Sequence, residues 1–208
     1  MALNYITGMP GSGKTAVRDE LERRGFTTYD IDDGLAHYYN LETNEPIAHH
    51  MPAEARTPEW RKKHAWKVPR SEIERLRTEA ADMPIFLCGV VANDANDFWD
   101  LFNTVFALII DEPTLRHRIT TRTTGDYGKN EHEFASLLAW QQTVADDYRK
   151  LGAVLIDATK PLPQVVDEIL TRLGKTKQIA QKRSRNISFS PSDHWLYRFP
   201  LPPIFHPV

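Results

Sequence analysis

GMPGSGKT, residues 8–15, is the stretch of sequence that decides the fold. It matches in full the pattern G-x-x-x-x-G-K-[ST] of a phosphate-binding loop. Glycines allow the backbone to come close to an anion, and successive N–H groups form an anion nest at the start of a helix. A short strand at residues 4–7 precedes the loop and an amphipathic helix from about Lys14 to Arg24 follows it. This is the context that a genuine loop of this type requires.

The whole loop is predicted to bind the phosphates of ATP or a similar triphosphate. Its residues are Gly8, Met9, Pro10, Gly11, Ser12, Gly13, Lys14 and Thr15. Lys14 is expected to reach the β- and γ-phosphates, and the Thr15 hydroxyl is expected to ligate Mg²⁺.

Strand-like and helix-like runs alternate outward from the loop. Residues 26–31, 84–91, 104–110 and 153–157 are strand-like, and the runs 84–91 and 104–110 are continuously apolar. Such runs are typical of parallel strands that are buried on both faces. Together with residues 4–7 they predict a five-stranded parallel sheet with helices on both faces, the three-layer α/β fold of P-loop NTPases. The clearer helices are expected at 70–81, 131–151 and 162–173, and short helices and loops at 33–69.

Composition narrows the function classes. The chain has 208 residues and a net charge of −2, so it has no global attraction to nucleic acid or to an anionic membrane. Its single cysteine, Cys88, excludes a disulfide framework and a thiolate metal cluster. No run approaches the roughly 18 apolar residues of a membrane span. We therefore expect a cytoplasmic protein whose partners are ATP and a small acceptor, with no membrane and no nucleic acid.

Carboxylates follow the second predicted strand, at Asp30, Asp32 and Asp33. In open α/β sheets the ligand crevice lies outside the carboxyl ends of the strands, so these groups should face the phosphate loop. We assign Asp32 as the base that accepts the proton of an attacking hydroxyl, and Asp30 to the Mg²⁺ side. Asp33 is interpreted as a helix cap.

The segment 113–129 has the features of a mobile lid. Arg118 and Arg122 are four residues apart and would share one helix face, where two guanidiniums suit base stacking and phosphate binding. A Thr- and Gly-rich loop follows, as expected for a lid that closes over a phosphoryl transfer. Aromatic and basic residues also gather at 56–67, where they would either line a pocket for an anionic or aromatic acceptor or form a solvated helix face.

The chain resembles the nucleoside monophosphate kinase and shikimate kinase group of P-loop kinases. Three stretches of sequence carry the resemblance: GMPGSGKT, the DID at 30–32, and LRHRITTR at 115–122. The likeness covers residues 3–173. It implies that Arg118 stacks on adenine, that Arg122 touches phosphate, and that the loop with Thr159 holds the adenine edge. The chain also resembles bacterial P-loop proteins described as AAA-type or adenylate kinase-like. The acceptor-binding segment of nucleoside monophosphate kinases is replaced here by CGVVAND at 88–94, which leaves the acceptor open.

The sequence thus predicts an ATP-dependent phosphotransferase acting on a nucleotide or a small hydroxylated metabolite. An alternative is a hydrolytic ATPase, because the strand at 106–110 ends in Asp111-Glu112, as a Walker B segment does. In that case Asp111 would bind Mg²⁺ and Glu112 would polarise water. The nucleotide-binding domain is expected to span residues 1–174. Residues 175–208 are interpreted as a tail that is first basic and then rich in proline and aromatic residues.

Overall fold

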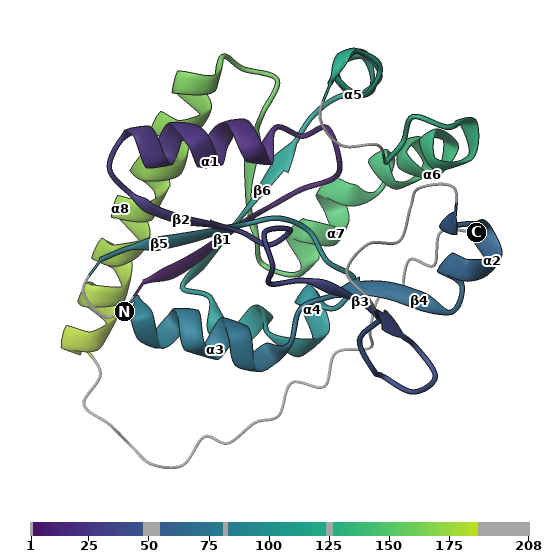
Figure 1. Cartoon of the computed structure of the whole chain (residues 1–208). Helices are drawn as coiled ribbons and strands as arrows, with labels where there is room; N and C mark the ends of the chain where they lie inside the picture. The colour runs from purple at the N-terminus through teal and green to yellow at the C-terminus, as the bar shows by residue number, and fades with distance from the viewer. Residues whose placement is uncertain (1, 48–54, 81–82, 124–126, 187–208) are drawn as a thin grey trace.

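A computed structural model of the chain describes residues 2–47, 55–80, 83–123 and 127–186. Its centre is a parallel five-stranded sheet with the strand order β2-β5-β1-β6-β7 (Figure 1). The five strands are β1 (Leu3–Thr7), β2 (Thr27–Asp30), β5 (Ile85–Cys88), β6 (Thr104–Ile109) and β7 (Val154–Asp157). The predicted fold class and the number of strands in this sheet are confirmed.

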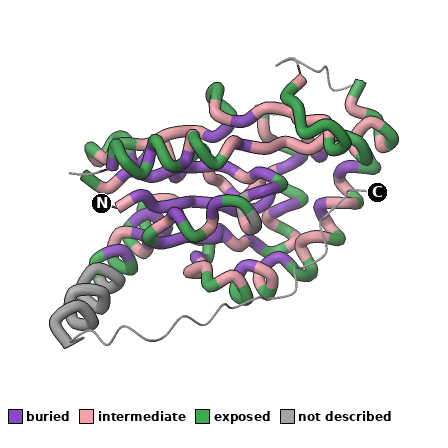
Figure 2. The backbone as a smooth tube through the Cα atoms, turned by 90° about the horizontal axis from the view of Figure 1, so that it is seen from below, coloured by how far each residue is buried: buried purple, intermediate pink, exposed green. Residues whose placement is uncertain are grey.

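Helices pack on both faces of the sheet. Of these, α1 (Lys14–Arg23) and α8 (Leu162–Asn186) lie side by side on one face, and α3 (Arg70–Glu79) covers the other (Figure 1). Because side chains alternate along a strand, neighbouring residues of β1 feed the two cores, Ile6 on the side of α1 and Tyr5 on the side of α3. The buried backbone follows the strands through the middle of the molecule (Figure 2).

The phosphate loop lies at a switch point of the sheet. Strand β1 pairs in parallel with β5 on one side and β6 on the other, so the chain turns in opposite directions from this central strand. Ligands of open α/β sheets bind at such a point, outside the carboxyl ends of the strands. The loop after β1 and the carboxylates after β2 are therefore brought to the same edge.

The segment 33–69 differs from the prediction of short helices and loops. It holds an antiparallel pair, β3 (His37–Asn40) and β4 (His64–Lys67), with the one-turn helix α2 (Pro58–Arg61) before β4. All eight strand residues are half-buried, so no alternation of apolar and polar residues marks them. Because β3 follows Asp33 instead of a helix, the predicted helix cap at Asp33 is wrong.

The lid side of the molecule contains α5 (Glu112–Thr121), α6 (Glu131–Gln141) and α7 (Val144–Lys150). The single helix predicted over 131–151 is thus wrong, since the chain bends at Gln142 and Thr143. Helix α7, which begins after the bend, contributes the buried residues Val144 and Tyr148. Two short elements, α4 (Asp94–Asp97) and the 3₁₀ helix η2 (Trp99–Leu101), connect β5 to β6.

The last helix runs past the expected boundary at Gly174. Helix α8 continues to Asn186, through lysine, glutamine, arginine and alanine, which are good helix formers. One exposed glycine costs a helix only about 1 kcal/mol, which is too little to end it. The Pro-rich segment after it lies outside the described residues. Among the described helices, none is long and apolar enough to cross a membrane.

Candidate functional site

The phosphate loop has the shape of an anion nest. Gly8 has a φ of +145°, and a Cβ on it would come within 2.7 Å of the Leu108 carbonyl oxygen and 2.8 Å of the Ser12 Oγ. Gly13 caps α1 in the left-handed region, at a φ of 99°. The Ser12 hydroxyl is buried in the loop without a hydrogen-bond partner. An orphaned donor inside a glycine cradle fits a phosphate group.

Lys14 lies inside the nest. Its Nζ donates to the carbonyl oxygens of Gly8 at 2.7 Å and Met9 at 3.1 Å. Loss of hydration lowers the pKa of Lys14 to about 8, although the carboxylates of Asp32 and Asp30 act in the opposite direction and Arg122 adds to the depression. Strands β1 and β2 end at the same edge of the sheet, so Lys14 and the carboxylates of Asp30 and Asp32 are near enough for their charges to act on one another. Phosphate oxygens there would replace the two carbonyls as partners of Lys14.

Asp32 lies at the same edge of the sheet. The indole Nε1 of Trp66 on β4 donates to its Oδ1 at 2.8 Å. The carboxylate is reachable by solvent, yet the groups around it remove part of its hydration and raise its pKa, an effect that the Trp66 hydrogen bond and Lys14 oppose. A solvent-reachable carboxylate with a raised pKa is suited to act as a general base near neutral pH.

Asp30, predicted to lie on the Mg²⁺ side, accepts two hydrogen bonds from the protein itself. Its Oδ2 accepts from Arg18 Nη1 at 2.5 Å, and its Oδ1 accepts the backbone N–H of Asp32 at 3.0 Å. Each oxygen keeps a second lone pair, and the Mg²⁺ role of Asp30 stays a prediction. Thr15 is exposed in the first turn of α1, where its hydroxyl is free to hold Mg²⁺. Within the described ranges, no group of three His, Cys, Asp or Glu side chains is arranged as a metal site.

Arg118 joins the phosphate loop to the loop that contains Thr159. Its Nη1 donates to Ser12 O at 3.0 Å, and its Nη2 donates to Ala158 O at 2.8 Å. Thr159 itself donates from N and Oγ1 to Asp157 Oδ1, at 3.1 and 2.6 Å. The guanidinium thus lies between the two segments where the prediction placed adenine.

Arg122 does not share a helix face with Arg118, which corrects the prediction. It is the C-cap of α5, and its ψ of 141° turns the chain out of the helix. Its Nη2 donates to the Tyr127 carbonyl, and its charge acts on Lys14. Both arginines still reach the site, Arg118 from the helix and Arg122 from the turn that follows it.

Asp111 and Glu112 are used at the start of α5. Asp111 is the N-cap, and its Oδ1 accepts from Thr114 N at 2.9 Å, which holds the pKa of Asp111 below its usual range. Glu112 pairs with Arg116 one turn on, at 2.7 Å. Both carboxylates thus stabilise the start of α5, which does not support the Walker B roles that the ATPase alternative gives them.

A buried ion pair, missed by sequence reasoning, joins the lid side to α2. Arg61 pairs with Glu133, and their side chains are only 12% and 11% exposed. The Arg61 guanidinium also lies over the Tyr127 ring at 4.9 Å, and Glu133 Oε2 accepts from Gly128 N at 2.8 Å. The pair therefore fixes the segment whose Tyr127 carbonyl holds Arg122. No local sequence pattern could have linked Arg61 to Glu133, because the two residues are 72 positions apart.

Breaking this pair should destabilise the protein measurably. Arg61→Met would leave Glu133 almost buried without its partner, a change that costs about 3 kcal/mol in comparable sites. The free energy of unfolding from urea titration would show the loss. Arg149→Met is the matched control, because Arg149 and Asp146 form a pair whose side chains are 62% and 69% exposed; it should cost less than about 1 kcal/mol. Equal losses for the two variants would contradict the structural role of the Arg61–Glu133 pair.

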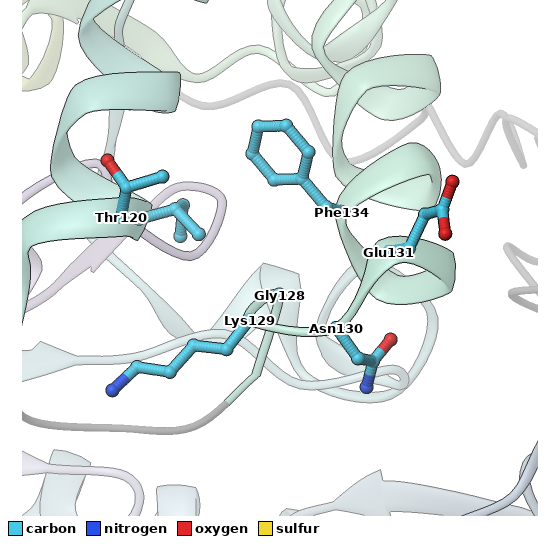
Figure 3. Close-up of a pocket in the computed structure, with 7 residues that line it drawn as sticks. Thr120, Gly128, Lys129, Asn130, Glu131 and Phe134 are labelled. Atoms are coloured by element: carbon cyan, nitrogen blue, oxygen red, sulfur yellow. The ribbon is translucent and has the colours of Figure 1, made fainter.

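A separate pocket of about 480 Å³ lies between α5 and the start of α6 (Figure 3). Thr120 on α5 and Phe134 on α6 stand on opposite sides of it. It is lined by Ile119, Thr120, Gly128, Lys129, Asn130, Glu131 and Phe134. None of the predicted site residues lines this pocket, so it is not the predicted nucleotide site.

Comparison with known proteins agrees with this geometry. Similar solved structures include a shikimate kinase from Bacteroides thetaiotaomicron, with 13% identity over 83% of this chain and 98% of that one and a TM-score of 0.56. A gluconokinase from Sinorhizobium meliloti has 21% identity over 88% and 97%, with a TM-score of 0.52. A deoxyadenosine kinase from M. mycoides has 14% identity over 83% and 99%, with a TM-score of 0.51. At these identities the likeness establishes a kinase-like P-loop fold.

No curated protein matches the chain significantly. A family model described as an AAA domain matches residues 5–138, which include the phosphate loop, the carboxylates after β2, both lid arginines and the Arg61–Glu133 pair. The match covers well over half of the sequence, and the chain therefore belongs to the AAA domain family.

Proposed function

We propose that the protein is a phosphotransferase that moves the γ-phosphoryl group of ATP to a hydroxyl group of a small molecule or nucleotide. The observation that carries this proposal is the placement of Lys14, in the loop after β1, and Asp32, directly after β2, at the same edge of the parallel sheet. Lys14 supplies positive charge for the transferred group, and Asp32 supplies a base for the hydroxyl that attacks it. A nucleotide-binding switch would need the first of these groups but not the second.

The chain's own residues divide the work between binding and chemistry. The loop amides of residues 8–15 bind the phosphates. The Lys14 ammonium exchanges its hydrogen bonds to the Gly8 and Met9 carbonyls for hydrogen bonds to the transferred phosphoryl group. Arg118 and Thr159 define the adenine side, and Arg122 adds positive charge near Lys14. Mg²⁺ held by the Thr15 hydroxyl would neutralise charge on the β- and γ-phosphates.

The transfer itself needs one proton acceptor. As the hydroxyl oxygen of the acceptor forms its bond to the γ-phosphorus, the bond to the ADP oxygen breaks and the hydroxyl proton passes to the Asp32 carboxylate. Asp32 must therefore be ionised before the reaction. The indole N–H of Trp66 favours the ionised form and opposes the loss of hydration that raises the pKa of Asp32.

Acceptor-dependent ADP formation is the test. The protein should form ADP from Mg²⁺-ATP much faster with one acceptor of a mixed panel than with none. Equal ADP formation with and without every acceptor would instead favour the ATPase alternative at Asp111 and Glu112.

A pH profile should reveal the Trp66 hydrogen bond. Trp66→Phe removes a donor that lowers the pKa of Asp32, so that pKa should rise further. Since the base acts when deprotonated, the acid limb of kcat/KM should move to higher pH. Trp60→Phe is the control, because Trp60 belongs to the same aromatic cluster. The hydrogen bond from the Trp60 backbone N–H to Thr57 Oγ1 is unaffected by this substitution. Profiles that shift equally in both variants, or in neither, would contradict the assignment of Asp32 as the base held by Trp66.

A further inference from the structure

An aromatic platform, defined by Tyr38, Trp60 and Trp66, stands beside the proposed base. Tyr38 lies 4.8 Å from Trp60 and 4.7 Å from Trp66 between ring centroids. His64 stacks on Trp60, with 4.2 Å between the ring centroids. All of these rings are half-buried, so each keeps a part of its surface open to solvent. Three elements, β3, β4 and α2, contribute to the platform, and they lie beyond the carboxyl ends of the strands (Figure 1).

The platform is tied directly to the site. Trp66 Nε1 donates to Asp32 Oδ1 at 2.8 Å, so a molecule resting on the platform has Asp32 within reach of its hydroxyl groups. Open aromatic faces bind flat or apolar ring faces such as nucleobases. The position and the chemistry of the platform thus match an acceptor that carries a ring.

The charges on this side disfavour an anionic acceptor. Arg18 is held by Asp30 at 2.5 Å and by Asp19 at 2.8 Å, and Arg61 is held by Glu133. Recognition of a phosphate or carboxylate by arginine depends on a guanidinium fork that is available to it. These two forks already bind carboxylates of the protein itself.

Negative groups also surround the place where the hydroxyl must lie. Asp32 and Asp33 are exposed there, and Asp30 stands next to them at the end of β2. Of the basic residues next to the platform, Arg56 donates to the Tyr38 hydroxyl at 3.3 Å, and Lys62 and Lys63 lie exposed between α2 and β4. A second negative charge on the acceptor would meet repulsion that an uncharged molecule avoids.

We propose that the acceptor is an uncharged, ring-bearing alcohol, a nucleoside or a sugar, whose ring lies against Trp66 while its hydroxyl reaches Asp32. This rests on the phosphotransferase function proposed above. It narrows that function by excluding nucleoside monophosphates and other acidic acceptors. Nucleosides and sugars share the required chemistry, an uncharged ring face with hydroxyl groups beside it.

Matched acceptor pairs test this inference. ADP formation from Mg²⁺-ATP would be measured with nucleosides against their 5′-monophosphates, and with neutral sugars against the corresponding sugar phosphates. The uncharged member of one pair should give a kcat/KM about tenfold or more above its phosphorylated partner. The pair that responds then shows whether the acceptor is a nucleoside or a sugar.

Two results would overturn the proposal of an uncharged acceptor. A phosphorylated member that is preferred would reject the uncharged acceptor but leave the phosphotransferase function standing. No acceleration by any member, charged or uncharged, would remove the proposed function and this inference with it.

Variants of the platform give an independent readout. Trp66→Leu should raise the KM of the uncharged acceptor about tenfold, as loss of a stacking ring does, and leave the KM of ATP within about twofold. Tyr39→Leu is the control: Tyr39 neighbours Tyr38 on β3 but points to the opposite face, where Lys67 lies over its ring at 5.5 Å. Tyr38→Leu repeats the test if Trp66→Leu fails to fold. Equal effects at Tyr38 and Tyr39 would overturn the role of the platform.

Discussion

Lys14→Met should reduce phosphoryl transfer by about 100- to 1000-fold, the effect of removing one charged donor from a transferring group. The variant loses the ammonium group that donates to the Gly8 and Met9 carbonyls inside the nest. Methionine is close to lysine in length and is apolar, so the loop around it should keep its shape. ATP binding, followed by calorimetry, should weaken together with turnover.

A lysine far from the loop gives the control for this variant. Lys150 lies at the end of α7 with its side chain 76% exposed, 3.7 Å from Asp147. Lys150→Met should leave both ATP binding and turnover unchanged. Unchanged ATP affinity in Lys14→Met would contradict the location of the nucleotide site itself.

Asp32→Asn should lower kcat by about 10²- to 10⁴-fold, the range that general acid–base catalysis contributes. The amide keeps an oxygen to accept from Trp66 Nε1, so the hairpin should stay in place, but it cannot take up the hydroxyl proton. ATP binding should be retained, because the loop amides and Lys14 are untouched. The loss should therefore fall on kcat in steady-state kinetics.

The neighbouring carboxylate is the natural comparison. Asp33 is exposed on the same turn, and the structure describes only its backbone N–H as bonded, to the Asp30 carbonyl at 3.2 Å. Asp33→Asn removes one negative charge from the same turn but leaves the proposed proton acceptor in place, so it should lower kcat far less than Asp32→Asn does. If Asp32→Asn kept full activity, or if Asp33→Asn lost as much, Asp32 would not be the base.

Much of the sheet could be predicted because each strand is marked by the residues within its own short stretch of sequence. The runs 84–91 and 104–110 are apolar throughout, as strands covered on both faces must be, and they became β5 and β6. The phosphate loop was predictable for a similar reason, since its glycines and Lys14 act through their own backbone and side-chain positions. Helix α1 ends at Arg23, close to the predicted end at Arg24, and Gly25 with its φ of 86° follows the C-cap.

The parts that could not be predicted depend on contacts between distant segments. Strands β3 and β4 have no apolar alternation, and their pairing places Trp66 on Asp32 across 34 positions. The Arg61–Glu133 pair spans 72 positions and fixes the turn that carries Arg122. Arg18 could have been noticed, because it follows Lys14 by four residues and so lies on the same helix face, near Asp30.

The most direct test of the phosphotransferase account is the fate of the γ-phosphoryl group. ATP labelled at the γ-phosphate would be incubated with the protein, Mg²⁺ and a pool of nucleosides and neutral sugars, with Lys14→Met as the blank. The account predicts that the label leaves ATP as an organic phosphate ester, dependent on the pool and absent from the blank. Label recovered only as inorganic phosphate, at a rate that the pool does not change, would contradict phosphoryl transfer and favour hydrolysis.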